Sequence, residues 1–377
     1  MAEPGVDQPR RLTLVVASLE SGGAERAVSE LANAWAARGR AVTVITLHHA
    51  RNDFYTLHPA VTRVVLDVLG VSASPVHAVW HNLRRIWHLR RAIARSAPDC
   101  VIAFNDQTNV ATLLATAGLR LSVIVMEQTD PRHHHIGPAW SWLRRRLYPH
   151  ATRVVVQTRS VAAWVAAFVA RDRVAVVPNP LPAPTGAEPA DVSPAIALPT
   201  TFVVAMGRLV ELKGFHTLLE SFAIATTDLL SWHLVIMGEG PERTRLEALA
   251  STLGIADRVH LPGNVAPPAP VLARAQLFVL ASRYEGFANA LVEAMSVGCA
   301  VVSTDCQSGP AEIITDGVDG LLVPVGDVRA MAAAIRALVS APERRAALGQ
   351  AARGVNQRYA RDLVVQQWDD LLRLAVC

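Results

Sequence analysis

The chain has 377 residues, of which 51% are hydrophobic and 18% are charged, and its 36 Lys and Arg residues against 32 Asp and Glu residues give a formal net charge of +4. Low charge with abundant apolar residues excludes a disordered or fibrous chain, and the length exceeds what one hydrophobic core usually supports, so we expect two domains. Every basic residue except Lys213 is arginine, which makes Lys213 a candidate for a role that suits a compact ammonium better than a planar guanidinium.

No secretion signal or membrane-spanning segment is predicted. The first residues include Glu3 and Asp7 and lack the apolar run of a signal peptide, and the longest uncharged apolar run, 160–170, is about half of the ~20 residues that cross a bilayer. The cysteines form no C-x-x-C pair and no Cys/His ligand spacing, so we expect reduced structural thiols in a cytoplasmic protein at Cys100, Cys299, Cys306 and Cys377.

Short β-branched runs alternate with amphipathic segments along the chain, a pattern typical of βα units around parallel sheets. In the first half, a helix is predicted over 24–38, and the predicted strands are 12–17, 42–47, 100–104, 121–126 and 153–157. Seven prolines then fall between 178 and 200, too many for a helix or a central strand. The alternation resumes with predicted strands at 202–206, 233–237, 259–261, 277–280 and 300–303.

This order predicts an α/β protein with two doubly wound parallel-sheet domains facing a cleft. We expect the domains to be 10–180 and 200–355, joined by a proline-rich linker at 181–199, with a C-terminal helix over 356–377 that packs back toward the N-terminal domain. Ligands of such sheets bind beyond the carboxyl ends of the strands, so the loops after the strands are where chemistry is sought.

Gly22 and Gly23 separate the first predicted strand from the first predicted helix. Glycines at such a turn allow backbone N–H groups to face an anion at the start of the helix. The dinucleotide fingerprint and the P-loop are both absent, so a plain tight turn is an equal alternative.

The loop after the strand at 202–206 carries Arg208 and Lys213. Two cations between a strand end and a helix suit the clamping of a diphosphate, although two solvated loop charges fit the same pattern. The stretch after the strand at 277–280 carries Glu285 and Glu293, with Asn289 as the expected N-cap of a helix. A carboxylate at Glu293 suits the two hydroxyls of a ribose.

Together these motifs resemble the retaining GT-B glycosyltransferases of family 4. The spacing Glu285-x7-Glu293 is similar to that family's E-x7-E signature, and Gly207-Arg208 with Lys213-Gly214 is similar to its donor-phosphate loop. The segments 21–26, 235–241, 261–263 and 312–324 also follow the family's order. The resemblance is strong from about 200 to 330 and looser before 180.

The resemblance implies that the domain 10–180 binds the acceptor and that the domain 200–355 binds the nucleotide-sugar donor through a set of contacts. Arg208 and Lys213 would hold the diphosphate, Glu293 the ribose, and Glu285 the hydroxyls of the donor sugar. The remaining donor-binding residues are Gly207, Gly238, Gly286, Phe287, Ala288 and Asn289. The family implies no metal and no cofactor, because the two cations take the place of a divalent ion.

The catalytic partner on the N-terminal side stays undecided. Many family members place a histidine after the strand that here ends at 126, whereas this chain has Glu127 and Gln128 there and its histidines later, beginning at His133. Three adjacent histidines cannot all face one point on a helix, so a metal site is not predicted.

The segment from Val71 to His150 contains ten arginines and four acidic residues, which gives it a net charge of +6. Trp80, Leu83, Ile86 and Trp87 share one helical face beside arginines, a pattern that suits an anionic membrane surface. Packing of these residues onto the sheet is the favoured alternative. Nucleic acid is a poor partner, because no recognition motif accompanies the charge.

The predicted function is transfer, with retention, of a hexose or N-acetylhexosamine from a nucleotide diphosphate sugar, with UDP as the expected nucleotide, to a lipid-linked or surface-polysaccharide acceptor. The enzyme is expected in the cytoplasm, with a peripheral position at the inner face of the membrane as an option. A sugar-nucleotide epimerase and an inactive binding subunit of the same fold stay open as alternatives.

Overall fold

The computed structural model describes residues 10–20, 22–50, 53–68, 75–182 and 198–376. The chain divides into two compact units. Unit 1 comprises the residues up to 183 together with those from 361 onward, and unit 2 comprises 184–360. Most of the predicted linker, 181–199, lies outside the described residues.

Unit 1 is built on a seven-stranded sheet whose neighbouring strands all pair in parallel, in the order β3-β2-β1-β4-β5-β6-β7. Its described strands are β1 Arg11–Val16, β2 Ala41–Thr46, β3 Thr62–Val65, β4 Cys100–Phe104, β5 Ser122–Glu127, β6 Arg153–Val156 and β7 Val174–Val176. Its described α-helices are α1 Gly23–Ala37, α2 Pro75–Ser96, α3 Asp106–Thr116, α4 Pro138–Leu147, α5 Arg159–Val165 and α14 Arg361–Val376.

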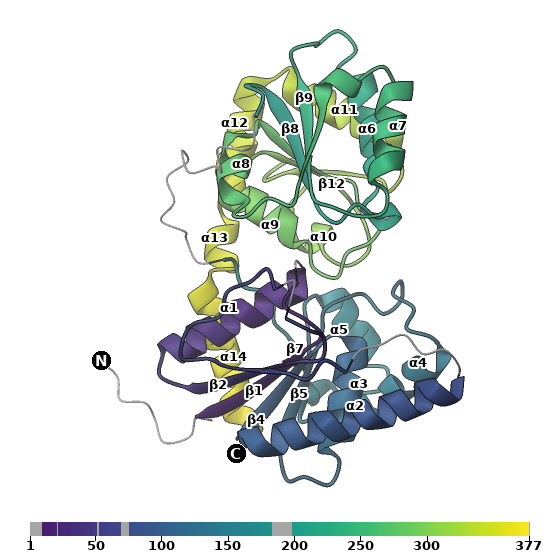
Figure 1. Cartoon of the computed structure of the whole chain (residues 1–377). Coiled ribbons are helices and arrows are strands. Elements are labelled where there is room, and N and C mark those ends of the chain that lie inside the picture. Colours follow the sequence, from purple (N-terminus) through teal and green to yellow (C-terminus); the bar gives the residue numbers. More distant parts are fainter. Residues whose placement is uncertain (1–9, 21, 51–52, 69–74, 183–197, 377) are drawn as a thin grey trace. The chain divides into compact units, whose positions relative to one another are not determined.

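Helices cover both faces of the unit 1 sheet (Figure 1), and a hydrophobic core lies on each face. Because successive strand residues point to opposite faces, Leu12 and Leu14 of β1 pack with α1 and α14, whereas Val15 packs with α2, α3 and α5. These two layers of helices bury the sheet, which explains why its strands read as continuous apolar runs.

The apolar stripe predicted on α2 faces away from the sheet. Trp80, Leu83 and Trp87 are 57%, 61% and 51% exposed, so the interpretation that they pack onto the sheet is wrong. Leu89 on another face of α2 is buried in the core instead, and Ile86 packs partly against it. Across the described residues, no helix combines the length and the apolar character needed to cross a bilayer.

Unit 2 has a six-stranded parallel sheet in the order β10-β9-β8-β11-β12-β13. Its described strands are β8 Phe202–Met206, β9 His233–Met237, β10 Val259–Gly263, β11 Leu277–Leu280, β12 Val301–Thr304 and β13 Leu321–Val323. Its described α-helices are α6 Phe215–Ala225, α7 Arg243–Thr252, α8 Ala269–Arg274, α9 Asn289–Ser296, α10 Pro310–Ile313, α11 Val328–Val339, α12 Pro342–Ala352 and α13 Val355–Arg358.

Both sheets have the strand order of a doubly wound Rossmann-type fold. In such a sheet the first three strands are added in one direction and the later strands in the other, so the strand order reverses between the first and the fourth strand. Ligands bind in the crevice at the carboxyl ends of those two strands. The reversal lies between β1 and β4 in unit 1 and between β8 and β11 in unit 2. The loops after these strands are therefore the places to look for functional side chains.

The last helix, α14, is part of the unit 1 core. Trp368 is fully buried, and its ring lies edge-on to Trp35 at 6.3 Å and beside Phe104 at 6.2 Å. The neighbouring Asp369 accepts a hydrogen bond of 2.9 Å from the Trp35 indole and forms a 2.9 Å ion pair with Arg40. The C-terminal helix is thus held to unit 1 by aromatic packing and by a carboxylate.

Truncation of this anchor should destabilise unit 1. We predict that Trp368→Ala lowers the free energy of unfolding by roughly 3–5 kcal/mol, because it leaves a large cavity among Trp35, Phe104 and the sheet. The matched control is Leu374→Ala on the same helix, where the side chain is 64% exposed and the change should stay within about 0.5 kcal/mol. Urea denaturation of the three proteins measures both; equal losses in the two variants would contradict the assignment.

Candidate functional site

The loops after β8 and β11 meet at the reversal point of the unit 2 sheet. Gly214 has a left-handed backbone with φ of +64°, and a Cβ there would collide with the carbonyl oxygen of Ala281. The backbone N–H of Arg283 also donates to the carbonyl of Leu212 at 2.9 Å. Glycine at 214 therefore allows the two loops to lie in direct backbone contact.

Two of the predicted site residues pair across this contact. Lys213 Nζ lies 2.7 Å from Glu285 Oε1, and the Ser282 hydroxyl is 2.6 Å from the same oxygen. Glu285 is buried and Lys213 is partly buried. An ammonium has three donors, so Lys213 retains hydrogen-bonding capacity for a ligand while its position is held by Glu285.

Arg208 has a different environment from Lys213. Its side chain is exposed at the end of β8, and no acidic group within the described part of the chain forms an ion pair with it. The loop itself is anchored, since the Gly207 N–H donates to the backbone carbonyl of Met237 at 2.9 Å and the Leu209 N–H donates to the backbone carbonyl of Glu239 at 2.9 Å. The sheet thus fixes the backbone of Arg208 and leaves its guanidinium in solvent.

Glycines bring the loops of neighbouring strands together. A Cβ at Gly238 would collide with the carbonyl oxygen of Gly207, so the turns after β8 and β9 touch through their backbones. Gly238 N–H also donates to Gly263, at the end of β10, at 2.8 Å. These contacts hold the predicted donor-binding glycines Gly207 and Gly238 at one edge of the sheet.

Helix α9 begins one residue earlier than a cap at Asn289 would place its start. Asn289 is its first residue, Ala288 is the N-cap, and no side chain caps the helix, so the N-cap prediction for Asn289 is wrong. Glu293 is buried and lies on the second turn of α9. Phe287 is also buried, with its ring edge-on to Tyr359 at 5.4 Å, while Gly286 is partly exposed.

A third loop, which follows β12, was not predicted to be part of the site. A Cβ at Gly309 would lie 3.6 Å from the Ala288 nitrogen and 3.7 Å from Glu285 Cβ, so this loop runs beside the predicted donor segment. Burial, with a smaller effect from Glu285, raises the pKa of the neighbouring Cys306 thiol to about 12. Its position directly after a predicted strand was the available signal.

In unit 1, Gly22 and Gly23 form the start of α1. Gly23 is the first residue of the helix, and Gly22 is its N-cap with an extended backbone. A Cβ at Gly22 would meet the carboxylate of Glu25, and Arg26 N–H donates to the Gly22 carbonyl at 3.1 Å. The first turn of α1 thus carries an acidic side chain, Glu25, next to Gly22.

Glu127 is enclosed within unit 1. Its carboxylate accepts a 2.5 Å hydrogen bond from Tyr148, and Arg144 lies 3.5 Å away. Burial raises the pKa of Glu127 from an ordinary value of 4.5 to about 7, despite the opposing effect of Arg144.

Gln128 makes hydrogen bonds with other side chains of unit 1. It is buried and shares hydrogen bonds with Gln157 and Asn179. The side chains of Glu127, the last residue of β5, and of Gln128, which follows it, thus make contacts inside the unit.

A pocket of about 290 Å³ lies at the reversal point of the unit 1 sheet, and neither Glu127 nor Gln128 lines it. His134 does, with its Nε2 3.3 Å from Asp106 Oδ2, whereas His133 is exposed outside the lining. The full lining is Ala17, Leu47, Arg85, Asn105, Asp106, Gln107, Thr108, Thr129 and His134. Within the described ranges, no three His, Cys, Asp or Glu side chains are grouped as a metal site requires.

Two family models match the chain, one in each half. The model described as "Glycosyl transferase 4-like domain" matches residues 22–180, and the model described as "Glycosyl transferases group 1" matches residues 189–355. The second of these matches contains both strands of the unit 2 reversal point, β8 and β11, whereas the first begins after β1 and contains β4 of the unit 1 reversal point.

Similar sequences include two bacterial proteins with named activities. The chain is 29% identical to the GalNAc-α-(1→4)-GalNAc-α-(1→3)-diNAcBac-PP-undecaprenol α-1,4-N-acetyl-D-galactosaminyltransferase of Campylobacter jejuni, over 85% of this chain and 87% of that protein. It is 33% identical over 75% of its length to an exopolysaccharide phosphotransferase of Streptomyces coelicolor, of which it spans only 29%.

Similar solved structures establish the fold. Anabaena HepE in complex with UDP and glucose superposes with a TM-score of 0.80 at 19% identity, covering 96% of this chain and 99% of that one. The sucrose-phosphate synthase from Thermosynechococcus elongatus superposes with a TM-score of 0.80 at 19% identity, covering 96% and 98%. The fold class predicted from the sequence is confirmed.

The raised pKa of Glu127 leads to a pH prediction. The folded chain binds this proton more tightly than the unfolded chain, so stability falls as the pH rises from about 4.5 through 7. The free energy of unfolding of the wild type minus that of Glu127→Gln should fall by up to about 3 kcal/mol across this window and be level outside it. Chemical denaturation at a series of pH values measures the difference, and a difference that is constant or rises with pH would show that Arg144 keeps the carboxylate ionised.

Proposed function

The chain belongs to the GT-B glycosyltransferases, and on that premise we propose that it transfers a hexose or N-acetylhexosamine from a UDP-sugar to a hydroxyl of a lipid-linked or surface-polysaccharide acceptor, with retention at the anomeric carbon. The UDP and glucose named with the Anabaena structure support the choice of donor. The undecaprenol-linked saccharide in the name of the Campylobacter relative supports the class of acceptor.

One observation carries the assignment of the donor site to unit 2: the Lys213–Glu285 pair at the reversal point of its sheet, with Arg208 exposed on the same loop. When the bond between sugar and diphosphate breaks, negative charge accumulates on the leaving diphosphate. Cations aimed at that charge stabilise the transition state more than the ground state and thereby raise the rate. We assign this role to Arg208 and Lys213, and the proposal needs no bound metal ion.

Glu285 has two roles in this scheme. Its Oε1 orients the Lys213 ammonium and takes the contact with Ser282, and its Oε2 is assigned to hydroxyls of the donor sugar. Glu285 and Glu293 are not the acid and nucleophile of a glycosidase, because those two carboxylates must flank one bond. Glu293 is assigned to the ribose, at the other end of the donor.

The acceptor is assigned to the pocket of unit 1. Its lining includes the Asp106–His134 pair together with Asn105 and Thr129, all beyond the carboxyl ends of β4 and β5. Hydrogen-bond donors and acceptors that converge in this way suit the hydroxyl groups of a saccharide. We therefore place His134, rather than His133, Glu127 or Gln128, next to the acceptor.

Loss of the ammonium tests the charge-stabilising role. Lys213→Ala should lower kcat by roughly 10²–10³, the usual effect of removing one group that stabilises charge in the transition state. Release of UDP from a UDP-sugar with a lipid-linked saccharide acceptor measures the rate, with donor alone as the blank. Arg245→Ala, at an exposed position on α7, is the matched control and should turn over as the wild type does; wild-type turnover by Lys213→Ala would remove this residue from the site.

The ribose assignment is tested by binding rather than by rate. Glu293→Gln should weaken UDP binding by roughly 1.5–3 kcal/mol, the scale of a hydrogen bond to a charged group. Calorimetric titration with UDP measures the loss, and Glu343→Gln on the exposed start of α12 serves as the control. If both variants bind UDP as tightly as the wild type, Glu293 does not contact the ribose.

A further inference from the structure

Three large apolar side chains form a stripe on the outer face of α2. Trp80, Leu83 and Trp87, the three residues found to face away from the sheet, are spaced three and four residues apart and therefore lie along one side of the helix. Helix α4 carries a further exposed indole, Trp142, which is 58% exposed. Apolar side chains this exposed and this ordered along a helix mark an interaction surface.

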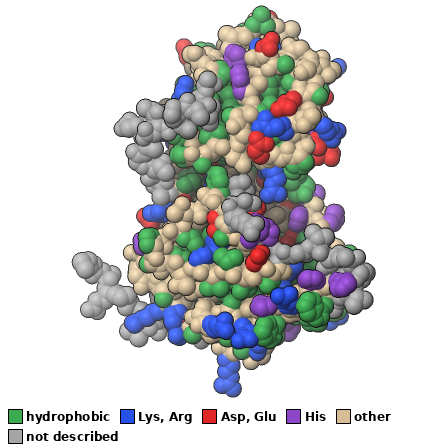
Figure 2. All heavy atoms as spheres, viewed as in Figure 1, with side chains coloured by type: hydrophobic (Ala, Val, Ile, Leu, Met, Phe, Trp, Pro, Cys, Tyr) green, Lys and Arg blue, Asp and Glu red, His purple; other side chains and the backbone are tan. Residues whose placement is uncertain are grey.

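The stripe is surrounded by positive charge. Helix α2 contains five arginines and no acidic residue, and α4 contains three arginines and no acidic residue. Guanidinium groups stack on the exposed rings, with Arg84 over Trp80 at 5.7 Å, Arg91 over Trp87 at 4.6 Å and Arg146 over Trp142 at 5.6 Å. Figure 2 shows basic, apolar and histidine side chains intermixed on this part of unit 1.

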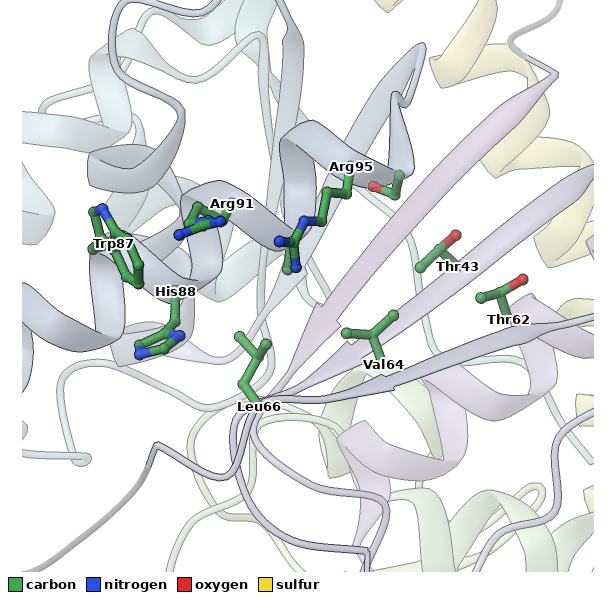
Figure 3. Close-up of a pocket in the computed structure, with 10 residues that line it drawn as sticks. Thr43, Thr62, Val64, Leu66, Trp87, His88, Arg91 and Arg95 are labelled. Atoms are coloured by element: carbon green, nitrogen blue, oxygen red, sulfur yellow. The ribbon is translucent and has the colours of Figure 1, made fainter.

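A groove of about 530 Å³ continues the stripe toward the edge of the sheet (Figure 3). Its apolar side is formed by Val64 and Leu66, on and just after the edge strand β3, and its other side by Trp87, Arg91 and Arg95 of α2. The rest of the lining is Thr43, Thr62, His88, Ala92 and Ser96. An apolar floor beneath two exposed guanidinium groups suits a molecule with an apolar chain and an anionic head.

We propose that this surface of unit 1, defined by Trp80, Leu83, Trp87, Arg84, Arg91 and Arg95, docks onto an anionic phospholipid bilayer. Indole rings favour the boundary between headgroups and acyl chains, and the arginines attract the negative surface of acidic lipids. The groove between α2 and β3 receives an acidic headgroup at Arg91 and Arg95. The inference deepens the proposed function, because a lipid-linked acceptor lies at such a surface.

Two other partners fit the observations less well. A second copy of the chain seated on the same surface would bring two acid-free, arginine-rich helices against each other, and like charges repel. A nucleic acid would attract the arginines but would offer Leu83 no apolar medium. The bilayer surface satisfies both the charge and the apolar stripe.

Vesicle binding by the full chain tests the proposal without donor or acceptor, so its failure is distinct from failure of the proposed transferase. Flotation with vesicles of phosphatidylcholine alone and of a phosphatidylcholine–phosphatidylglycerol mixture should show binding to the mixed vesicles at least about tenfold tighter. Added salt should weaken that binding. Equal binding to both vesicle types, or to neither, would overturn the proposal.

Two sets of variants separate the apolar and the charged contributions. Trp80→Ser with Trp87→Ser, and Arg84→Gln with Arg91→Gln and Arg95→Gln, should each weaken binding to the mixed vesicles by roughly tenfold or more. Leu230→Ser and Arg245→Gln, at exposed positions of unit 2, should bind as the wild type does. Circular dichroism confirms folding, which these exposed substitutions should preserve.

Three further results would contradict the proposal. Wild-type binding by both sets of variants would remove the surface from membrane contact. Dimerisation in analytical ultracentrifugation that is lost in the tryptophan variants, without vesicle binding, would identify the surface as an interface between copies. Tight binding to an oligonucleotide without vesicle binding would identify a nucleic-acid partner instead.

Discussion

The ion pair between Lys213 and Glu285 joins the two loops on which the donor site of unit 2 depends. Its 2.7 Å contact lies where the strand order of the sheet reverses, between β8 and β11. Gly214 allows the backbones of the two loops to approach closely enough for this ion pair to form. Removing either partner would leave a charge without its counterion in a partly buried position. A lysine suits this place because an ammonium meets Glu285 with one of its three donors and offers the others to a ligand.

Both units use the same arrangement of strands to hold polar side chains. In each sheet the strand order is that of a doubly wound fold, and polar residues gather in the loops at the reversal point. Unit 2 presents cations there, which suit a diphosphate, whereas unit 1 presents the Asp106–His134 pair and hydroxyl and amide groups, which suit a saccharide. The difference in chemistry between the two edges underlies the assignment of donor and acceptor.

The sequence predicted the central strands well, because β-branched runs with turn residues on either side have few alternatives. The short strands β3, β7 and β13, each at an edge of its sheet, were not predicted, because most of their residues are partly or fully exposed and they form no buried apolar run. Helical spacing showed that Trp80, Leu83 and Trp87 share a face, but Leu89 and Ile93 give α2 a second apolar face. Only packing against the sheet determines which face is buried.

The donor site was predicted because Lys213 and Glu285, although 72 residues apart, each lie in a motif of the family, whereas the acceptor side was left open because Asp106 and His134 lie in no such motif. Asp106 and His134 are 28 residues apart and meet only because β4 and β5 are neighbours. Glu127 directly follows a predicted strand, yet the fold encloses it with Tyr148 and Arg144 rather than exposing it to a ligand. Position after a strand therefore locates an edge of the sheet without showing which side chain faces the pocket.

Thermal unfolding of the full chain with a panel of nucleotides and nucleotide sugars tests whether unit 2 binds a nucleotide diphosphate sugar through the loops of Lys213 and Glu285. A ligand at 100 times its Kd adds about 2.7 kcal/mol of stability. We expect UDP and UDP-sugars to raise Tm, nucleoside monophosphates to raise it less, and free sugars to leave it unchanged. If no nucleotide or nucleotide sugar changes Tm, the assignment of the donor site is wrong.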